Sequence, residues 1–325
     1  MDLLRVSGIN KRSEGFALNN ISFNLKRGQK LSIAGETGSG KSTLLKIIAG
    51  LVQPESGSIE FENEKVLGPE EKLIPGHPRI AYLSQHFELR NNYKVEELLD
   101  MANKLPVDEA ETIYEVCQIE HLLKRKTSEL SGGEKQRIAT AKLLITSPKL
   151  LLLDEPYSNL DMGHKKILKS VINDITKKLS ITCIMVSHDP PETLSWADEI
   201  MIMEAGHIIQ AGTPEEVYRK PHSKYVASLF GDYNIIRHQE ATRMGASTEN
   251  IIGKNIFTRP EDYKIVQHEE QAVIGEVEKI CFLGSYYQIE VSIDETLITV
   301  NACECTVAKG DLVYLSLQLN EPWYL

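Results

Sequence analysis

The stretch GETGSGKST, residues 35–43, constrains the fold of this chain more than any other stretch. It has the spacing of a P-loop, GxxxxGK[ST], and it stands between an apolar run at 30–35 and a helical pattern at 42–51. Such a loop binds phosphate where a strand ends and a helix begins, because the glycine-rich turn and the helix start supply backbone N–H groups together. The sequence therefore predicts an α/β fold with a nucleotide at the end of this strand.

Each part of this loop is expected to contact the nucleotide or its metal. The glycines let backbone N–H groups close around the β-phosphate, and Lys41 would reach the β- and γ-phosphates. Ser42 would ligate Mg²⁺ through its hydroxyl. The predicted nucleotide-binding residues of the loop are Gly35, Glu36, Thr37, Gly38, Ser39, Gly40, Lys41, Ser42 and Thr43.

Other apolar runs end in polar residues that suit hydrolysis. LLLLDEP at 150–156 ends in Asp154, which would hold the magnesium through water, and Glu155, which would polarise the attacking water as general base. Gln85 ends the run RIAYLSQ, where its amide could touch both the metal and the water. His188 ends a third run, although a lone histidine is more often structural. Near-continuous apolar runs of this kind are typical of buried parallel strands whose carboxyl ends carry chemistry.

A second glycine-rich helix start lies far downstream, in SELSGGEKQR at 128–137. Ser131 suits an N-cap with Glu134 three residues later, which together form a capping box. The same Ser131–Gly132–Gly133 turn offers a hydroxyl and open backbone amides to an anion. The residues alone leave these two interpretations about even.

Composition excludes some classes of function. The net charge is −10, which argues against a broad nucleic-acid-binding surface but not against a local basic patch. The longest apolar runs are broken by proline or are shorter than the roughly 20 residues of a membrane-spanning helix. The first residues, MDLLRVSGINKRSEGF, lack the apolar core of a secretory leader. We therefore expect a chain without a membrane span of its own.

The sequence pattern changes near residue 231. Segments beyond about 251 alternate with a period of two, as in YYQIEVSI, where Tyr287, Ile289, Val291 and Ile293 share one face. Several short strands in so small a region predict a small β-barrel or sandwich. We place a nucleotide-binding domain at 1–231 and a second, all-β domain at 232–325.

The ordered set of P-loop, Gln85, LSGGEKQR, LLLLDEP, SNLD and SHD resembles the nucleotide-binding subunit of ABC transporters. This resemblance covers residues 1 to about 231. It implies a RecA-like core with an antiparallel β subdomain and a helical subdomain, ATP and Mg²⁺ as ligands, and a head-to-tail homodimer. In such a dimer the Ser131–Gly133 turn would contact the γ-phosphate bound by the partner. The resemblance also implies that Asp161 of SNLD crosses the dimer interface and that His188 contacts the γ-phosphate.

The tail resembles that of importer ATPases with a carboxy-terminal regulatory barrel of the OB-like or TOBE type. GTPEEVYRKPHSKYVASLFGDYN, FTRPED and GEVEKICFLGSYYQIEV carry this likeness. It implies transmembrane permease subunits as partners, an extracytoplasmic solute-binding protein as an indirect partner, and a peripheral location on the cytoplasmic face of the cell membrane. Such relatives take up polyamines, iron(III), sugars or oxyanions.

Two segments depart from the family pattern. Relatives usually place an aromatic residue ahead of the P-loop to stack on adenine, whereas this chain has Arg12 there and Phe16 four residues later. Either residue could stack on the base. The segment after Gln85, which would form much of the helical subdomain, is short and lacks the aromatic-Pro-His sequence common in importers.

Three alternatives remain open at this point. An ABC-type ATPase acting on nucleic acid or in translation would usually have two ATPase domains or a long coiled coil, neither of which is present. An export-type ATPase could carry the barrel as an added ligand sensor. The barrel itself could bind a small anion, a sugar or nucleic acid, or it could serve in regulation or dimerisation without a ligand.

Overall fold

The computed structural model describes residues 2–13, 15–85, 89–158, 160–246, 254–267, 272–319 and 321–325, without the side chains of Ser13 and Phe16. The chain divides into two compact units, Met1–Pro214 and Glu215–Leu325. Each unit has its own sheets and its own core. No helix among the described residues is long and apolar enough to cross a membrane.

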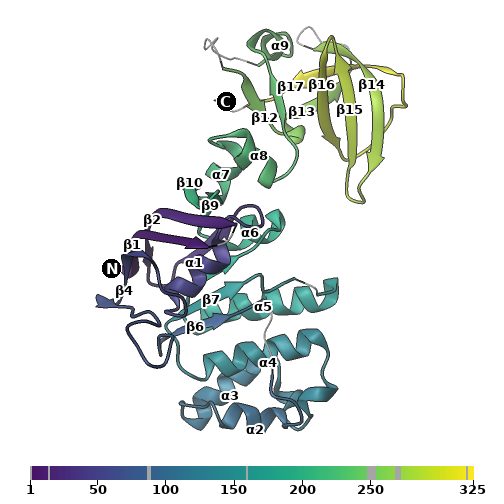
Figure 1. Cartoon of the computed structure of the whole chain (residues 1–325). Coiled ribbons are helices and arrows are strands. Elements are labelled where there is room, and N and C mark those ends of the chain that lie inside the picture. Colours follow the sequence, from purple (N-terminus) through teal and green to yellow (C-terminus); the bar gives the residue numbers. More distant parts are fainter. Residues whose placement is uncertain are drawn as a thin grey trace. The chain divides into compact units, whose positions relative to one another are not determined.

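The first unit is built on a sheet of mainly parallel strands (Figure 1). In spatial order its strands are β10 (His207–Gly212), β9 (Glu199–Glu204), β3 (Lys30–Ala34), β8 (Thr182–Val186), β7 (Leu150–Asp154) and β6 (Ile80–Leu83). All neighbours pair in parallel except β10, which returns antiparallel to β9 through a turn at Ala205–Gly206. The predicted buried parallel strands are confirmed.

Strand β7 shows why this sheet lies in the middle of the unit. All five residues of LLLLD are buried. Leu150 and Leu152 face a core shared with helix α1 (Lys41–Ile48), whereas Leu151 and Leu153 face a second core on the other side. Because successive side chains of a strand point to opposite faces, an uninterrupted leucine run supplies apolar surface to both layers.

A second, antiparallel sheet packs into the α1 core. Its strands, in spatial order, are β2 (Phe16–Lys26), β1 (Asp2–Ser13), β4 (Ser56–Phe61) and β5 (Glu64–Lys65). Leu4, Val6 and Ile21 contribute its apolar face to the core. This sheet is the antiparallel β subdomain that the resemblance implied; β1 and β2 precede the P-loop, and β4 and β5 follow it.

The opposite core is covered by helices, as the resemblance implied for a helical subdomain. The helices are α2 (Val95–Asp100), α3 (Val107–Val116), α4 (Gly132–Leu144), α5 (Met162–Lys178) and, near the end of the unit, α6 (Pro190–Trp196). Leu98, Ile113 and Ile138 join this core from three of these helices. Residues 86–88, at the start of the unusual segment after Gln85, lie outside the described residues.

The second unit is dominated by antiparallel strands. Its helices are α7 (Pro214–Arg219), α8 (Lys224–Leu229) and α9 (His238–Arg243). One sheet has the order β11 (Asn234–Ile236), β12 (Ile256–Thr258) and β18 (Trp323–Tyr324). The other has the order β13 (Tyr263–Val266), β17 (Leu312–Leu317), β14 (Val273–Phe282), β15 (Tyr287–Ile293) and β16 (Thr296–Ala302).

The period-two pattern predicted the larger of these sheets correctly. On β15, Ile289, Val291 and Ile293 are buried and Tyr287 is half-buried, while the residues between them are more exposed. Strands β13 and β16, at opposite ends of the sheet order, lie near each other, so the sheet curls towards closure. This all-β domain agrees with the expected barrel.

The boundary between the two compact units follows Pro214, which is 17 residues before the domain boundary predicted at residue 231. Arg259 supplies a physical reason for this difference. Its side chain is buried and donates hydrogen bonds to the carbonyl oxygens of Tyr218, Ala227, Gly231 and Asp232. These hydrogen bonds attach the segment that contains α7 and α8 to the rest of the second unit. The boundary at 231 as a functional limit of the ATPase domain stays a prediction.

Candidate nucleotide-binding and hydrolysis site

The loop between β3 and α1 has the backbone that a phosphate-binding turn requires. Gly35 has φ 147°, and a Cβ at this position would lie 2.1 Å from the carbonyl oxygen of Met203. Gly40, which caps α1, has φ 98°. Only glycine fits the first position, because both the dihedral angle and the neighbouring backbone exclude a side chain.

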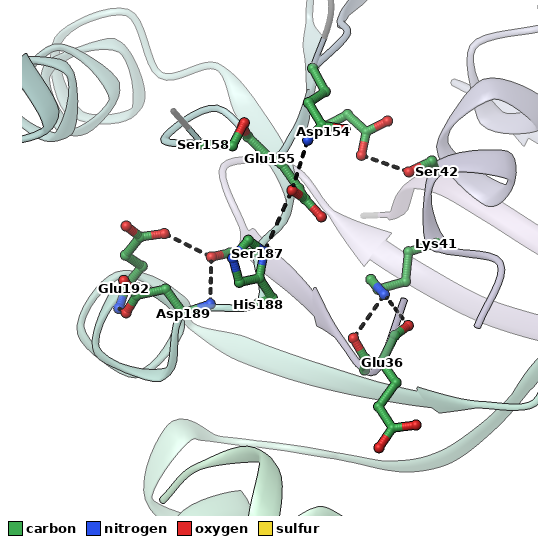
Figure 2. A network of polar contacts seen from close by, with 12 residues as sticks. Glu36, Lys41, Ser42, Asp154, Glu155, Ser158, Ser187, His188, Asp189 and Glu192 are labelled. Carbon is green, nitrogen blue, oxygen red and sulfur yellow. Dashed lines mark hydrogen bonds and ion pairs between the residues drawn. The ribbon is translucent and has the colours of Figure 1, made fainter. Parts of the chain in front are cut away.

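The Lys41 side chain lies inside this turn. Its Nζ donates to the carbonyl oxygens of Gly35 at 2.8 Å and Glu36 at 2.7 Å (Figure 2). Burial lowers the pKa of Lys41, and the carboxylates of Glu155 and Asp154 oppose this shift. A bound phosphate would add negative charge at the buried ammonium and favour its charged form.

A hydrogen bond joins the side chains of Ser42 and Asp154, which are far apart in the sequence. The Ser42 hydroxyl, at the start of α1, donates to Asp154 Oδ1 at 2.9 Å, and Asp154 ends β7 (Figure 2). The other carboxylate oxygen, Oδ2, accepts a 2.8 Å hydrogen bond from the hydroxyl of Tyr82 on β6. Burial, followed by this carboxylate, raises the pKa of Tyr82, so the phenol stays protonated and donates. Sequence analysis missed Tyr82; a polar aromatic residue inside an apolar strand was its only signal.

Glu155 lies between two other predicted residues. Its Oε2 accepts from Gln85 Nε2 at 3.2 Å and lies 3.5 Å from His188 Nδ1. Figure 2 shows His188 directed at the Glu155 carboxylate. These side chains follow β6, β7 and β8, so the parallel sheet gathers at one edge three residues that are far apart in sequence.

The backbone of Glu155 is held in a conformation that is uncommon for a residue with a side chain. Its φ is 48°, in the left-handed region. Its N–H donates to Val186 O at 3.0 Å, and its carbonyl accepts from Ser158 Oγ at 2.9 Å. Such a conformation persists where surrounding bonds enforce it, and it is common at functional sites.

The segment that carries His188 is anchored from α6. Ser187 Oγ donates to the buried carboxylate of Glu192 at 2.7 Å and accepts from the backbone N–H of Asp189 at 3.1 Å (Figure 2). Lys165 Nζ lies 2.8 Å from Asp189 Oδ2 and 2.5 Å from Glu192 Oε1. These bonds fix the backbone on both sides of His188 and leave its ring 68% exposed.

The second glycine-rich turn forms the predicted capping box. The Ser131 N–H donates to Glu134 Oε2 at 2.8 Å, and the Glu134 N–H donates to Ser131 Oγ at 3.3 Å. Ser131 and Gly132 are exposed at the start of α4, whereas Gly133 is buried. The capped helix is therefore confirmed, and the capping bonds leave two residues of the turn facing solvent.

Asp161 caps helix α5. Its Oδ1 accepts from the backbone N–H of His164 at 3.0 Å, and its Oδ2 lies 2.6 Å from the ring Nδ1 of His164. The other ring nitrogen, Nε2, lies 3.4 Å from Ser131 Oγ. His164 is a second residue that the sequence analysis missed, because nothing in SNLDMGHKK indicates which side chain faces Ser131.

The two candidates for adenine recognition lie at the β1–β2 hairpin. Arg12 is exposed, and its backbone N–H donates to Glu55 Oε1 at 2.9 Å. The side chain of Phe16 lies outside the described residues. Stacking of either residue on the base stays a prediction.

Comparisons with known proteins agree with this geometry. The family model described as ABC transporter matches residues 18–158. The chain is 32% identical to the spermidine/putrescine import ATP-binding protein PotA of Clostridium acetobutylicum over 336 residues, covering 97% of this chain and 94% of that protein. This chain belongs to the ABC transporter family of ATP-binding subunits. It is equally 32% identical to the sulfate/thiosulfate import ATP-binding protein CysA of Neisseria meningitidis, covering 94% and 93% of the two chains.

A solved structure supports the same assignment. The ABC transporter subunit cbiO1 of Clostridium perfringens, part of the complex cbiONQ, superposes with a TM-score of 0.58 and 32% identity, covering 66% of this chain and 90% of that one. The protein is thus an ATPase of the ABC type, with the P-loop NTPase core followed by the small all-β domain. The predicted fold class and enzyme class are confirmed.

Proposed function

We propose that this chain is the ATP-hydrolysing motor of an ABC importer. One observation carries the hydrolytic part: the Glu155 carboxylate is in contact with Gln85 and His188, next to the Ser42–Asp154 pair. A general base needs a held carboxylate near the metal and phosphate groups, and this arrangement provides one.

The residues of the P-loop would bind ATP by its phosphates. The β-phosphate would be surrounded by backbone N–H groups of the Gly35–Gly40 turn and of the start of α1. Lys41 Nζ would exchange its hydrogen bonds to the Gly35 and Glu36 carbonyl oxygens for bonds to phosphate oxygens. The Ser42 hydroxyl, the Asp154 carboxylate and the Gln85 amide oxygen are hard oxygen donors, so this set fits Mg²⁺. Bound Mg²⁺ would neutralise phosphate charge and orient the γ-phosphate.

Glu155 would then accept a proton from the attacking water. The contact with His188 keeps the carboxylate in place, and the exposed His188 ring would reach the γ-phosphate. Gln85 Nε2 already orients Glu155, which leaves its amide oxygen to face metal or water. Glu155 would thus act as the general base, and Gln85 and His188 would orient the reacting groups.

The other half of each site would come from a second copy of the chain. The Ser131–Gly133 turn exposes a hydroxyl and a helix start, both suited to an anion, and its contacts are with Glu134 and His164 rather than the P-loop. In a head-to-tail homodimer this turn would contact the γ-phosphate bound by the partner. Asp161 would lie at that interface.

The partners follow from the family. Transmembrane permease subunits would bind this chain on the cytoplasmic face of the cell membrane, and an extracytoplasmic solute-binding protein would deliver the solute. The relatives are named for import of spermidine/putrescine and of sulfate/thiosulfate. These solutes have opposite charges and this chain is 32% identical to both relatives, so the similarity favours neither solute. The proposal is therefore import without a named solute. The all-β unit would serve in regulation or dimerisation.

The composite site is tested by Ser131→Arg in the purified full chain. The large cation should abolish ATP hydrolysis by occupying the partner's phosphate position, whereas ADP binding at the P-loop should be unchanged. The same change at Ser228, an exposed serine of helix α8 in the second unit, is the matched control. Full turnover in Ser131→Arg would refute the composite site.

The import direction is tested with the permease encoded by neighbouring genes, reconstituted in vesicles. Solute should accumulate on the side of the membrane on which ATP is hydrolysed. Accumulation on the opposite side would establish export instead.

A further inference from the structure

Three side chains form a continuous chain between helices α4 and α5. Asp161 Oδ2 lies 2.6 Å from His164 Nδ1, and His164 Nε2 lies 3.4 Å from Ser131 Oγ. Asp161 and Ser131 are also the N-caps of their respective helices. The His164 ring thus connects the two helix starts that would lie at the interface of the proposed dimer.

The chemistry of Asp161 sets the direction of these hydrogen bonds. Its pKa is lowered by the hydrogen bond from the backbone N–H of His164 and then by the bond to the ring, so the carboxylate is ionised and only accepts. His164 Nδ1 therefore carries a proton and donates to Asp161. Ser131 Oγ already accepts from the Glu134 N–H, and its single hydroxyl proton is needed for a phosphate oxygen. With a proton on each ring nitrogen, His164 Nε2 donates to Ser131 Oγ and leaves that hydroxyl proton for the phosphate.

The same ring packs against the Ser131–Gly133 turn, which is called the signature turn below. A Cβ on Gly133 would lie 2.4 Å from His164 Cδ2 and 2.9 Å from His164 Cβ, so the missing side chain of Gly133 leaves the space that the ring fills. The ring is only partly exposed, at 35% of its side chain. His164 thus contacts the signature turn by packing at Gly133 and by a hydrogen bond at Ser131.

We propose that His164 is a positioning residue that sets the orientation of the Ser131 hydroxyl and couples it to Asp161. It would hold the Ser131–Gly133 turn in a fixed position relative to Asp161, so that the turn meets the partner's γ-phosphate while Asp161 meets the dimer interface. This inference rests on the proposed composite site. It adds a residue whose only part in hydrolysis is through Ser131.

Substitutions can separate the two hydrogen bonds of the ring. In His164→Asn the amide occupies the place of Nδ1, which keeps a donor for Asp161 and removes the group that faces Ser131. In His164→Gln the longer amide reaches towards the place of Nε2, which restores a polar group for Ser131. His164→Leu removes both bonds and keeps an apolar side chain against Gly133. The backbone cap from Asp161 to the His164 N–H remains in all three.

The experiment is steady-state ATP hydrolysis by these variants of the purified full chain. Loss of the hydrogen bond to Ser131 predicts a kcat about five-fold lower in His164→Asn. The kcat should be at least as low in His164→Leu, which loses both bonds, and at least half the original value in His164→Gln. ADP affinity should stay within about two-fold, because ADP lacks the γ-phosphate and binds through the P-loop. A wild-type kcat in His164→Asn would overturn the inference even if His164→Leu fails to fold.

A double-mutant cycle shows whether His164 acts through Ser131. Ser131→Ala with His164→Asn should hydrolyse ATP no more slowly than Ser131→Ala alone, since the hydroxyl that His164 orients is already absent. Independent, multiplicative losses would overturn the inference. If Ser131→Arg is inactive and His164→Asn is not impaired, only the role of His164 is wrong. If Ser131→Arg hydrolyses ATP normally, the composite site itself is wrong.

Discussion

Gln85 Nε2 donates a 3.2 Å hydrogen bond to Glu155 Oε2, although the two residues are 70 positions apart in the chain. The same carboxylate oxygen lies 3.5 Å from His188 Nδ1. One oxygen therefore receives both neighbours, and in the proposed site Oε1 would accept the proton of the attacking water. This asymmetry makes Glu155 the residue on which hydrolysis should depend most.

The first prediction is that Glu155→Gln separates ATP binding from hydrolysis. The amide keeps the size of the side chain and cannot accept a proton, so turnover should fall about 10²- to 10⁴-fold. ATP should still bind, and the variant should accumulate as an ATP-bound dimer in size-exclusion chromatography. Glu109→Gln, at an exposed position in the first turn of α3, is the control. Hydrolysis at the original rate would exclude Glu155 as general base.

The second prediction concerns Tyr82. Tyr82→Phe removes the hydroxyl that donates to Asp154 Oδ2 and leaves the ring in place. Because such outer contacts orient a metal-binding carboxylate, the Mg²⁺ concentration for half-maximal ATP hydrolysis should rise about 3- to 10-fold. Nucleotide binding measured without Mg²⁺ should be unchanged. An unaltered Mg²⁺ dependence would show that Tyr82 does not position Asp154 for the metal.

The third prediction concerns stability at low pH. Glu62 accepts hydrogen bonds from Lys149 at 2.8 Å and Arg27 at 2.6 Å and forms an ion pair with Arg79. These partners, Lys149 first and then Arg27, lower the pKa of Glu62 to about 2. The depressed pKa means that the stabilisation is complete above the unfolded-state value of 4.5 and is lost as the pH falls towards 2.

Glu62→Gln should therefore lower the free energy of unfolding by about 1–2 kcal/mol at neutral pH. The difference from the unmodified chain should shrink between pH 4.5 and 2, where the carboxylate itself becomes protonated. Urea unfolding at several pH values measures this difference. A difference that stays constant over that pH range would contradict the assignment to the carboxylate charge.

The fourth prediction concerns Arg259, whose guanidinium is buried and lies 4.1 Å from the ring centroid of Tyr218. Arg259→Met would leave four backbone carbonyl oxygens without this donor. It should lower the free energy of unfolding of the second unit by about 2–4 kcal/mol. Hydrogen exchange should become faster in α7 and α8, and ADP binding by the first unit should persist. Arg243→Met, which removes an exposed ion pair with Asp294, is the control and should change exchange little. Equal effects of the two substitutions would refute the anchoring role of Arg259.

Many residues of the candidate nucleotide-binding and hydrolysis site could be predicted from the sequence. The P-loop, the Asp154–Glu155 pair and the capping box at Ser131 are local patterns, because each function depends on residues within one turn or one strand end. The alternation on β15 is local as well, since it follows from the period of a strand. Local geometry of this kind is encoded in neighbouring residues and needs no knowledge of the partners across the fold.

Contacts between segments could not be predicted in the same way. The hydrogen bond from Tyr82 to Asp154 depends on which strand neighbours β7, and the contact of His164 with Ser131 depends on how α5 packs against α4. The burial of Arg259 depends on carbonyl groups up to 41 residues away. The sequence by itself determined which groups are expected to bind phosphate and where many of the strands and helices begin. The tertiary structure decided which side chains orient those groups, because that choice is made by packing between segments distant in the chain.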